Sequence, residues 1–72
     1  MGKPFSTILA AIEHGSNAIV PGTKPVDDLA ELAAAAKTYK VHLTIRGWRK
    51  SEKDMIRIAI LGGKYVTFDF SD

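Results

Sequence analysis

Residues 25–47 read PVDDLAELAAAAKTYKVHLTIRG, and the hydrophobic period of this stretch changes halfway along. Up to Ala36 the apolar side chains recur at intervals of three and four residues, as they do on one face of a helix. From Val41 to Ile45 apolar and polar side chains alternate strictly, as they do in a strand with one buried face. Pro25 suits the first turn of a helix. The stretch therefore predicts one helix followed by one strand.

The order of helix and then strand occurs three times along the chain, at a spacing of about 25 residues. The three units cover residues 4–22, 23–47 and 48–72. Each unit has apolar side chains on one face of a predicted helix, and a short β-rich segment follows. This recurrence predicts three structural units of the same kind.

Residues that favour helix ends stand at the expected places in the first and third units. Gly15 follows the first apolar stripe, and the pair Gly62-Gly63 follows the third. Ser51 and Asp54, three residues apart, resemble a capping box that starts the third helix. These residues predict where two of the three helices begin or end.

Strands that are joined by helices run parallel, and right-handed crossovers that step in one direction place every helix on the same face of the sheet. The sequence therefore predicts a single α/β domain over residues 1–72. It consists of three αβ repeat units, with a three-stranded parallel sheet and helices on one face. Parallel sheets usually have both faces covered, so we expect the open face to be either solvated or covered by a partner.

An alignment on Gly22 and Gly47 predicts the register of the three strands. The residues placed on the helix side are Ala18, Val20, Leu43, Ile45, Phe68 and Phe70. The open side then carries three rows with one residue from each strand: Asn17, His42, Thr67; Ile19, Thr44, Asp69; and Pro21, Arg46, Ser71. The two sets follow from the alternation of side chains along each strand.

The composition limits the classes of protein to which the chain can belong. The chain has 72 residues and no cysteine, which predicts one domain without disulfides. The chain has two histidines that could bind a metal ion, His14 and His42. Their spacing matches no known zinc pattern, so we expect no metal and no cofactor. No apolar tract approaches the ~20 residues of a membrane span, which predicts a cytoplasmic protein that does not enter a membrane.

The net charge of +2 conceals an uneven distribution along the chain. Residues 37–64 hold eight of the ten basic residues and two of the eight acidic residues, a balance of +6. The rest of the chain holds two basic and six acidic residues, a balance of −4. A field of this kind steers an acidic partner, a nucleic acid or the opposite end of a second copy.

A pattern shared with other sequences runs through residues 25–33, 41–47, 51–55 and 65–68. These segments read PVDDLAELA, VHLTIRG, SEKDM and YVTF. They resemble a group of small bacterial hypothetical proteins that carry PxDLAELAxLAKxxxVxLTxxG followed by SxxDLIxIAxxGxxxVxFxF. The resemblance implies the αβ repeat and implies nothing about chemistry.

Two basic loops follow the carboxyl ends of the predicted strands. Open α/β sheets bind ligands beyond these ends, where the following helices present N–H groups. The candidate residues for binding an anion or an acidic partner are Lys24, Arg46, Trp48, Arg49, Lys50 and Lys53. Neither loop has the spacing of a Walker A or a dinucleotide-binding motif. The alternative is a pair of solvated loops, because acidic residues already supply negative charge to both helix starts.

An aromatic side chain among cations is also typical of a nucleic-acid surface. Trp48 would stack on bases while the neighbouring basic residues hold phosphates. No helix-turn-helix, zinc finger or pair of RNA-binding aromatic residues is recognisable in the sequence. A nucleic-acid-binding accessory protein that uses residues 46–53 is therefore the alternative function.

The open face offers one arrangement that suggests catalysis. His42 with Asp69 resembles a base and the group that orients it, with Thr44 or Ser71 as the nucleophile. In the predicted register His42 and Asp69 are two residues out of step, and a flat sheet has no cleft that excludes water. Arg46 is an equally good diagonal partner for Asp69. We therefore expect no catalytic residue and no enzymatic activity.

The third helix carries more apolar surface than packing on one sheet requires. Ile56 and Ile60 stand where the second helix has Ala30 and Ala34, and either a neighbouring helix or a second copy covers them. The third strand is also an exposed edge. The residues expected to mediate self-association are Ile56, Ile60, Val66 and Phe68. The predicted function is a small non-enzymatic interaction or adaptor module that forms a homodimer and contacts an acidic protein through the basic loop.

Overall fold

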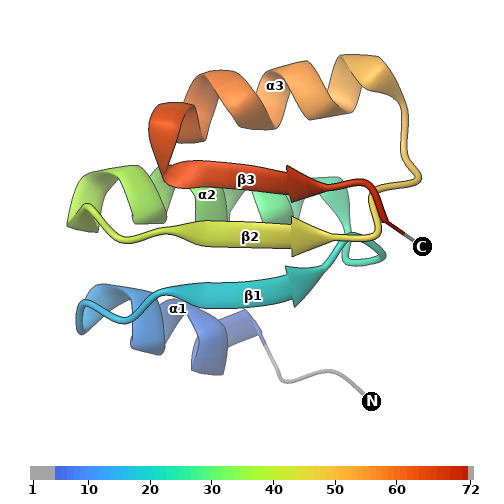
Figure 1. Ribbon diagram of the computed structural model, residues 1–72. Coiled ribbons are helices and arrows are strands. Elements are labelled where there is room, and N and C mark those ends of the chain that lie inside the picture. Colours follow the sequence, from blue (N-terminus) through green and yellow to red (C-terminus); the bar gives the residue numbers. More distant parts are fainter. Residues whose placement is uncertain (1–4, 72) are drawn as a thin grey trace.

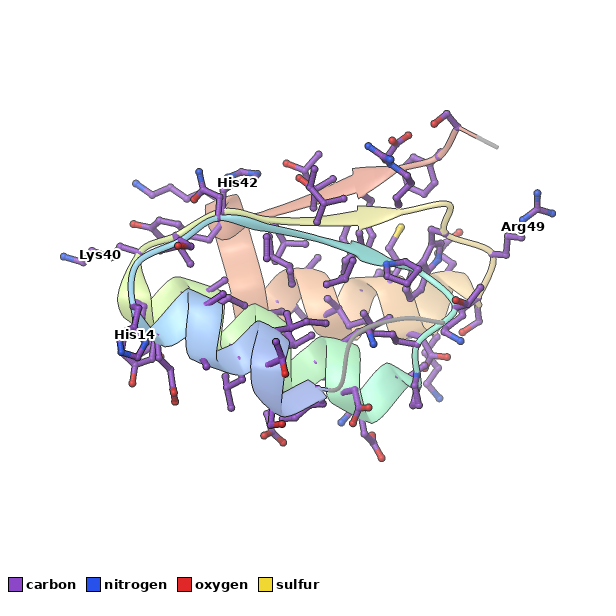
Figure 2. All side chains as sticks on the ribbon, turned by 90° about the horizontal axis from the view of Figure 1, so that it is seen from below. His14, Lys40, His42 and Arg49 are labelled. Carbon is purple, nitrogen blue, oxygen red and sulfur yellow. The ribbon has the colours of Figure 1, made fainter. Side chains whose placement is uncertain are left out.

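The computed structural model describes residues 5–71 of the chain. Its elements follow in the order α1 (Phe5–Glu13), β1 (Ala18–Pro21), α2 (Val26–Tyr39), β2 (Leu43–Arg46), α3 (Glu52–Gly62), the 3₁₀ turn η1 (Gly63–Tyr65) and β3 (Val66–Asp69). The strands form one parallel sheet in the order β1-β2-β3 (Figure 1). Figure 2 shows all three helices on one side of this sheet. The predicted α/β fold with helices on one face is confirmed.

α1 ends where the sequence predicts. Gly15 adopts φ 89°, in the left-handed region that glycine enters without strain. The Nδ1 of His14 lies 2.8 Å from Ala10 O, so the ring satisfies one carbonyl at the negative end of the helix. Ser16 N–H donates to Ala11 O at 3.0 Å. These bonds close the helix before the chain enters β1.

α3 begins at the predicted cap and ends at the predicted glycine pair. Ser51 Oγ accepts a hydrogen bond from Asp54 N–H at 3.1 Å, which gives one otherwise unpaired helix donor a partner. Gly63 has φ 55° and stops the helix after Gly62. A Cβ at Gly62 would lie 2.1 Å from Val66 Cγ2, so the absence of a side chain lets β3 start directly beneath the helix.

The hydrophobic core lies between the sheet and the helix layer. Its buried side chains are Ile12, Val20, Leu29, Ala30, Leu32, Ala33, Ala36, Val41, Leu43, Ile45 and Ile58. Five of them come from α2, which packs against both α1 and α3. Three of these five are alanines, whose small side chains let neighbouring elements approach closely. α2 is therefore the centre of the helix layer.

The register of β3 differs from the predicted one by two residues. β1 and β2 pair as predicted, with Ala18 opposite Leu43. On β3, however, Val66 lies opposite Leu43, where the sequence predicts Phe68. α3 extends through Gly62 and only the short turn η1 follows, so the chain enters the sheet earlier than the glycine alignment indicates. Because the shift is an even number, each side chain keeps its face of the sheet.

This shift changes the surroundings of two residues near the chain end. Phe68 takes the place opposite Ile45, so Phe70 lies beyond the core and is 62% exposed. Asp69 comes to lie directly opposite Arg46 instead of diagonal to it. Phe70 stays on the helix side, but its predicted place opposite Ile45 in the core is wrong, and the predicted rows of the open face change accordingly.

Candidate interaction surfaces

No helix or strand within residues 5–71 covers the open face of the sheet (Figure 2). Ile19 in β1 is 63% exposed, and Pro21 beside it is also exposed. A shallow hollow of about 270 Å³ lies here, lined by Ile19, Val20, Pro21 and Arg46. Because a single charged side chain reaches this hollow, its lining offers no set of groups that could share a chemical step.

His42 lies on the open face, and Figure 2 shows its side chain pointing away from the helices. Its backbone N–H donates to Asn17 Oδ1 at 2.8 Å, and its Nε2 is hydrogen-bonded to the Thr67 hydroxyl. The Cα partner of Thr67 is Thr44, so the bond from His42 runs diagonally across the strands. The sequence places these side chains in one row but does not reveal the hydrogen bonds that join them.

Asp69 is engaged on the open face by partners other than His42. Its Oδ1 accepts hydrogen bonds from the Ser71 hydroxyl at 2.5 Å and the Ser71 N–H at 2.9 Å. Arg46 Nε lies 3.7 Å from its Oδ2. The Ser71 bonds, assisted by the Arg46 charge, lower the pKa of Asp69 below its ordinary value of 3.8. This carboxylate is therefore an ion-pair partner in the sheet and does not orient His42.

The two loops at the carboxyl ends of the strands lie against each other. Gly22 N–H donates to Arg46 O at 2.7 Å. A Cβ at Gly22 would lie 3.0 Å from Gly47 O, which is tighter than nine in ten contacts of real Cβ atoms. Glycine at position 22 therefore allows the loop before α2 to approach the loop before α3.

The candidate side chains of these loops point to different sides of the molecule. Trp48 is half-buried, with its ring edge-on to Phe68 and the ring centroids 5.4 Å apart. Arg46 lies on the open face with Asp69. Figure 2 shows Arg49 extending away from the body of the molecule. The positive charges of these loops are therefore spread over the surface and do not converge on one site.

The lysines of the candidate set differ in burial. Lys53 is exposed in the first turn of α3, whereas Lys24 and Lys50 are half-buried in the loops. The helix starts also carry their own negative charge, because acidic residues occupy the first turns of both α2 and α3. A small anion would thus compete with carboxylates for both helix ends.

The outer face of α3 is apolar and basic. Ile56 and Ile60 are 47% and 72% exposed, one turn apart. Arg57 Nη1 lies 3.2 Å from Asp27 Oδ1 on α2, which shows that α2 packs against a different side of α3. The alternative in which a neighbouring helix buries the two isoleucines is therefore wrong. Together with Lys53 they form what we call the α3 outer face.

The neighbouring surface of α2 is acidic. Asp27 and Glu31 are exposed and stand four residues apart, so they point to the same side of the helix. The buried residues of α2 lie on the opposite side, toward the sheet. The helix layer therefore presents an acidic strip on α2 beside the apolar and basic strip of the α3 outer face.

β3 forms one edge of the sheet, and at its start the Val66 N–H is bonded to Gly63 O. Gly47 N–H donates to Asp69 O at 2.8 Å, so residue 69 directs its backbone groups toward β2. In a parallel sheet the backbone groups of successive residues point alternately toward the two neighbouring strands. Phe68 and Phe70 therefore direct their N–H and C=O groups outward, away from β2. The side chains of Val66 and Phe68 pack against the core. Their side chains are therefore turned inward, and the edge offers backbone groups, of which the Val66 N–H is already bonded within the chain.

The exposed ring of Phe70 belongs to this edge and was missed by sequence reasoning. It stacks on Phe68 at a centroid distance of 6.2 Å and an interplanar angle of 17°. The signal that could have found it is the short chain after the Gly62-Gly63 pair, which leaves room for a single turn before the strand. Counting from that pair puts Phe70 past the last position opposite β2.

Three further observations bear on the class of the protein. Within residues 5–71 no three His, Cys, Asp or Glu side chains gather closely enough to hold a metal ion. None of the described helices is long and apolar enough to cross a membrane. In comparisons with known proteins, no family model, no curated protein and no solved structure matches this chain.

Proposed function

We propose that the protein is a small non-enzymatic interaction module that self-associates through its helix layer. The observation that carries this proposal is the exposure of Ile56 and Ile60, one turn apart on the α3 outer face. Single exposed apolar side chains are common on protein surfaces, whereas an apolar pair with a charged rim is typical of a contact surface.

The charges of the helix layer favour a second copy of the chain as the occupant. Lys53 flanks the isoleucines on α3 and Glu31 lies on α2, beside the pair that Arg57 and Asp27 form within one copy. A two-fold axis between α2 and α3 would place the α3 outer face of each copy on the acidic strip of the other. Each half of the contact then pairs opposite charges around an apolar centre, and one surface serves both copies.

A stable contact needs more surface than α3 alone provides. α2 has 14 residues and α3 has 11, which corresponds to lengths of about 21 Å and 16 Å. Packed helices lie about 10 Å apart, so the pair is about 20 Å wide. A stable interface buries about 800 Å² on each partner. The outer faces of both helices, and not of α3 alone, therefore form the proposed contact.

The mass of the protein in solution tests this proposal. Size-exclusion chromatography with light scattering should give twice the chain mass of 7.8 kDa for the wild type. The variant with Ile56→Lys and Ile60→Lys should elute at the monomer mass and keep the circular dichroism spectrum of the folded protein. The reason is that both positions are exposed in the monomer, so lysine there disrupts the contact and not the core.

Ile19→Lys is the matched control for this experiment. Ile19 is 63% exposed, but it lies on the open sheet face, so this variant should remain a dimer. The milder pair Ile56→Ser and Ile60→Ser serves if the lysine variant fails to fold. A wild type that is monomeric at every concentration overturns the proposal, and so does a folded double variant that stays dimeric.

The same chromatogram tests nucleic-acid binding by residues 46–53. Nucleic acid that copurifies raises the absorbance at 260 nm relative to 280 nm in the protein peak. Trp48 is half-buried and packs edge-on against Phe68, which leaves less of its ring to stack on bases. We therefore expect no excess absorbance at 260 nm.

A further inference from the structure

We propose that the outer edge of β3 binds an extended acidic segment of another protein, which adds to the sheet as a fourth strand. Phe68 and Phe70 direct their backbone N–H and C=O groups away from β2, as the bond from Gly47 to Asp69 requires. An added strand pairs with these groups in the manner of β-augmentation. This contact is separate from the self-association surface, which lies on the outer side of the helix layer.

The opposite edge of the sheet is closed to such pairing. Ala18 N–H donates to His42 O at 3.0 Å, so residues 18 and 20 of β1 face β2 while Ile19 and Pro21 face outward. Pro21 has no N–H, and proline on an edge strand is a common protection against pairing. The edge of β3 carries no proline between Val66 and Ser71. The two edges therefore differ in a way that directs an added strand to β3.

The position of α3 favours a single segment over a second whole copy at this edge. Figure 1 shows α3 lying past β3, on the side away from β2. Paired strands lie about 4.8 Å apart, whereas packed helices need about 8–10 Å. If two copies joined their β3 edges, both α3 helices would enter the same space. An extended segment without a helix meets no such obstacle and lies beside the flank of α3.

That flank offers an apolar contact for alternate side chains of the added strand. Arg57 reaches Asp27 on α2, so residues on the other flank of α3 face the side of β3. Met55 and Ala59 occupy this flank, and both are half-buried. The exposed ring of Phe70 lies at the end of the same edge. Side chains of the added strand that point to the helix side are therefore expected to be apolar.

The charges around the edge favour acidic residues in the partner segment. Lys64 is exposed immediately before β3, and Lys50 lies in the loop at the carboxyl end of the sheet. Asp69, the acidic residue of β3, is already paired with Arg46 and bonded to Ser71. Residues 37–64, which include both lysines, have a balance of +6. A segment in which apolar and acidic residues alternate matches both the flank and this field.

A synthetic peptide in which valine and glutamate alternate is the probe for this contact. Binding is followed by NMR, together with hydrogen exchange of the backbone amides at low and high salt. The expected result is a slower exchange of the Phe68 and Phe70 amides on binding, and weaker binding at high salt. The matched control peptide carries lysine in place of glutamate and should bind at least about tenfold more weakly.

A pair of variants at one exposed position separates the backbone contact from the ring contact. Phe70→Ala removes the ring and keeps the N–H, whereas Phe70→Pro removes both. We expect Phe70→Pro to weaken peptide binding at least about fivefold more than Phe70→Ala, because the proline variant also loses one hydrogen bond of the ladder. Both variants should fold, since Phe70 lies outside the core.

Three outcomes would overturn the β3-edge proposal. These are an acidic peptide that leaves the Phe68 and Phe70 amides unprotected, equal binding of both peptides, and an oligothymidylate that binds residues 46–53 while the acidic peptide does not. The last outcome would mean that the basic residues of the protein bind nucleic acid and not an acidic segment. The variant with Ile56→Ser and Ile60→Ser adds no charge and should bind the peptide as the wild type does, so a failure of the dimer and a failure of this contact are distinguishable.

Discussion

Lys40 ends α2 in the left-handed region, with φ 58° and ψ 42°. Its N–H donates to Ala36 O and Lys37 O, so the helix closes with the usual bonds of such an end. Glycine is the residue that normally stands here, because a Cβ costs about 1 kcal/mol in this conformation. The sequence carries no glycine at this end of α2, and its pattern alone does not reveal the strain.

We expect Lys40→Gly to stabilise the protein by up to about 1 kcal/mol, because it removes that strain. For a chain of this size the gain corresponds to a rise in Tm of about 4–8 °C. Lys37→Gly is the matched control, since Lys37 lies inside the helix and glycine there should lower Tm. Thermal unfolding followed by circular dichroism measures both. A fall in Tm for Lys40→Gly would show that the lysine side chain itself stabilises this turn.

The lowered pKa of Asp69 makes a second prediction at the scale of one residue. The two Ser71 hydrogen bonds hold the pKa below 3.8 in the folded protein. The carboxylate therefore stabilises the fold above its ordinary pKa of 3.8, and this stabilisation is lost as the pH falls through the lower folded value. Thermal unfolding should show that the difference in Tm between wild type and Asp69→Asn shrinks as the pH falls below 3.8.

Ser71→Ala separates the contribution of the serine hydroxyl from that of Arg46. The variant should raise the pKa of Asp69 toward its ordinary value, because the Ser71 side chain is the largest cause of the shift. NMR titration of the Asp69 carboxyl carbon reads this directly. An unchanged pKa in Ser71→Ala would mean that the remaining contacts alone hold the carboxylate in its charged form.

At the scale of elements, the contact between the end of α3 and the start of β3 decides the register of the third strand. Val66 Cγ2 occupies the space that a Cβ at Gly62 would need. Val66 is then placed opposite Leu43, and the rest of β3 follows in register. One close contact between two neighbouring elements therefore determines which residues leave the core, including Phe70.

Gly62→Ala should destabilise the protein by about 1–3 kcal/mol, because the new Cβ would lie 2.1 Å from Val66 Cγ2 and 3.2 Å from Ala33 Cβ. Chemical denaturation of the variant measures this cost. The double variant with Val66→Ala should cost less than the sum of the two single variants, since the smaller side chain makes room. Additive costs in this cycle would show that the side chain of Val66 is not the obstacle.

At the scale of the whole molecule, two layers leave different surfaces open. The helix layer presents an acidic strip beside the α3 outer face, and the sheet presents an uncovered face and the edge of β3. The proposed self-association uses the helix layer, while the proposed acidic segment uses the edge of β3. Because these surfaces do not overlap, one molecule could serve both contacts at once.

The order and kind of the elements were predictable from the sequence because the signals for them are local. The period of apolar residues predicts each helix and strand, and residues such as Gly15 and Ser51 mark helix ends through bonds within a few positions. Parallel strands and helices on one face then follow from the handedness of the connections. The predicted register of β1 against β2 also agrees with the structure, since similar loops follow both strands.

The arrangement of the candidate surfaces depended on contacts between distant residues. The register of β3, and with it the exposure of Phe70 and the pairing of Asp69 with Arg46, follows from how closely the chain packs at Gly62. The exposure of Ile56 follows from which side of α3 meets α2. Hydrophobic period shows that a side chain prefers burial, but burial itself requires a neighbour, and only tertiary packing brings that neighbour into place.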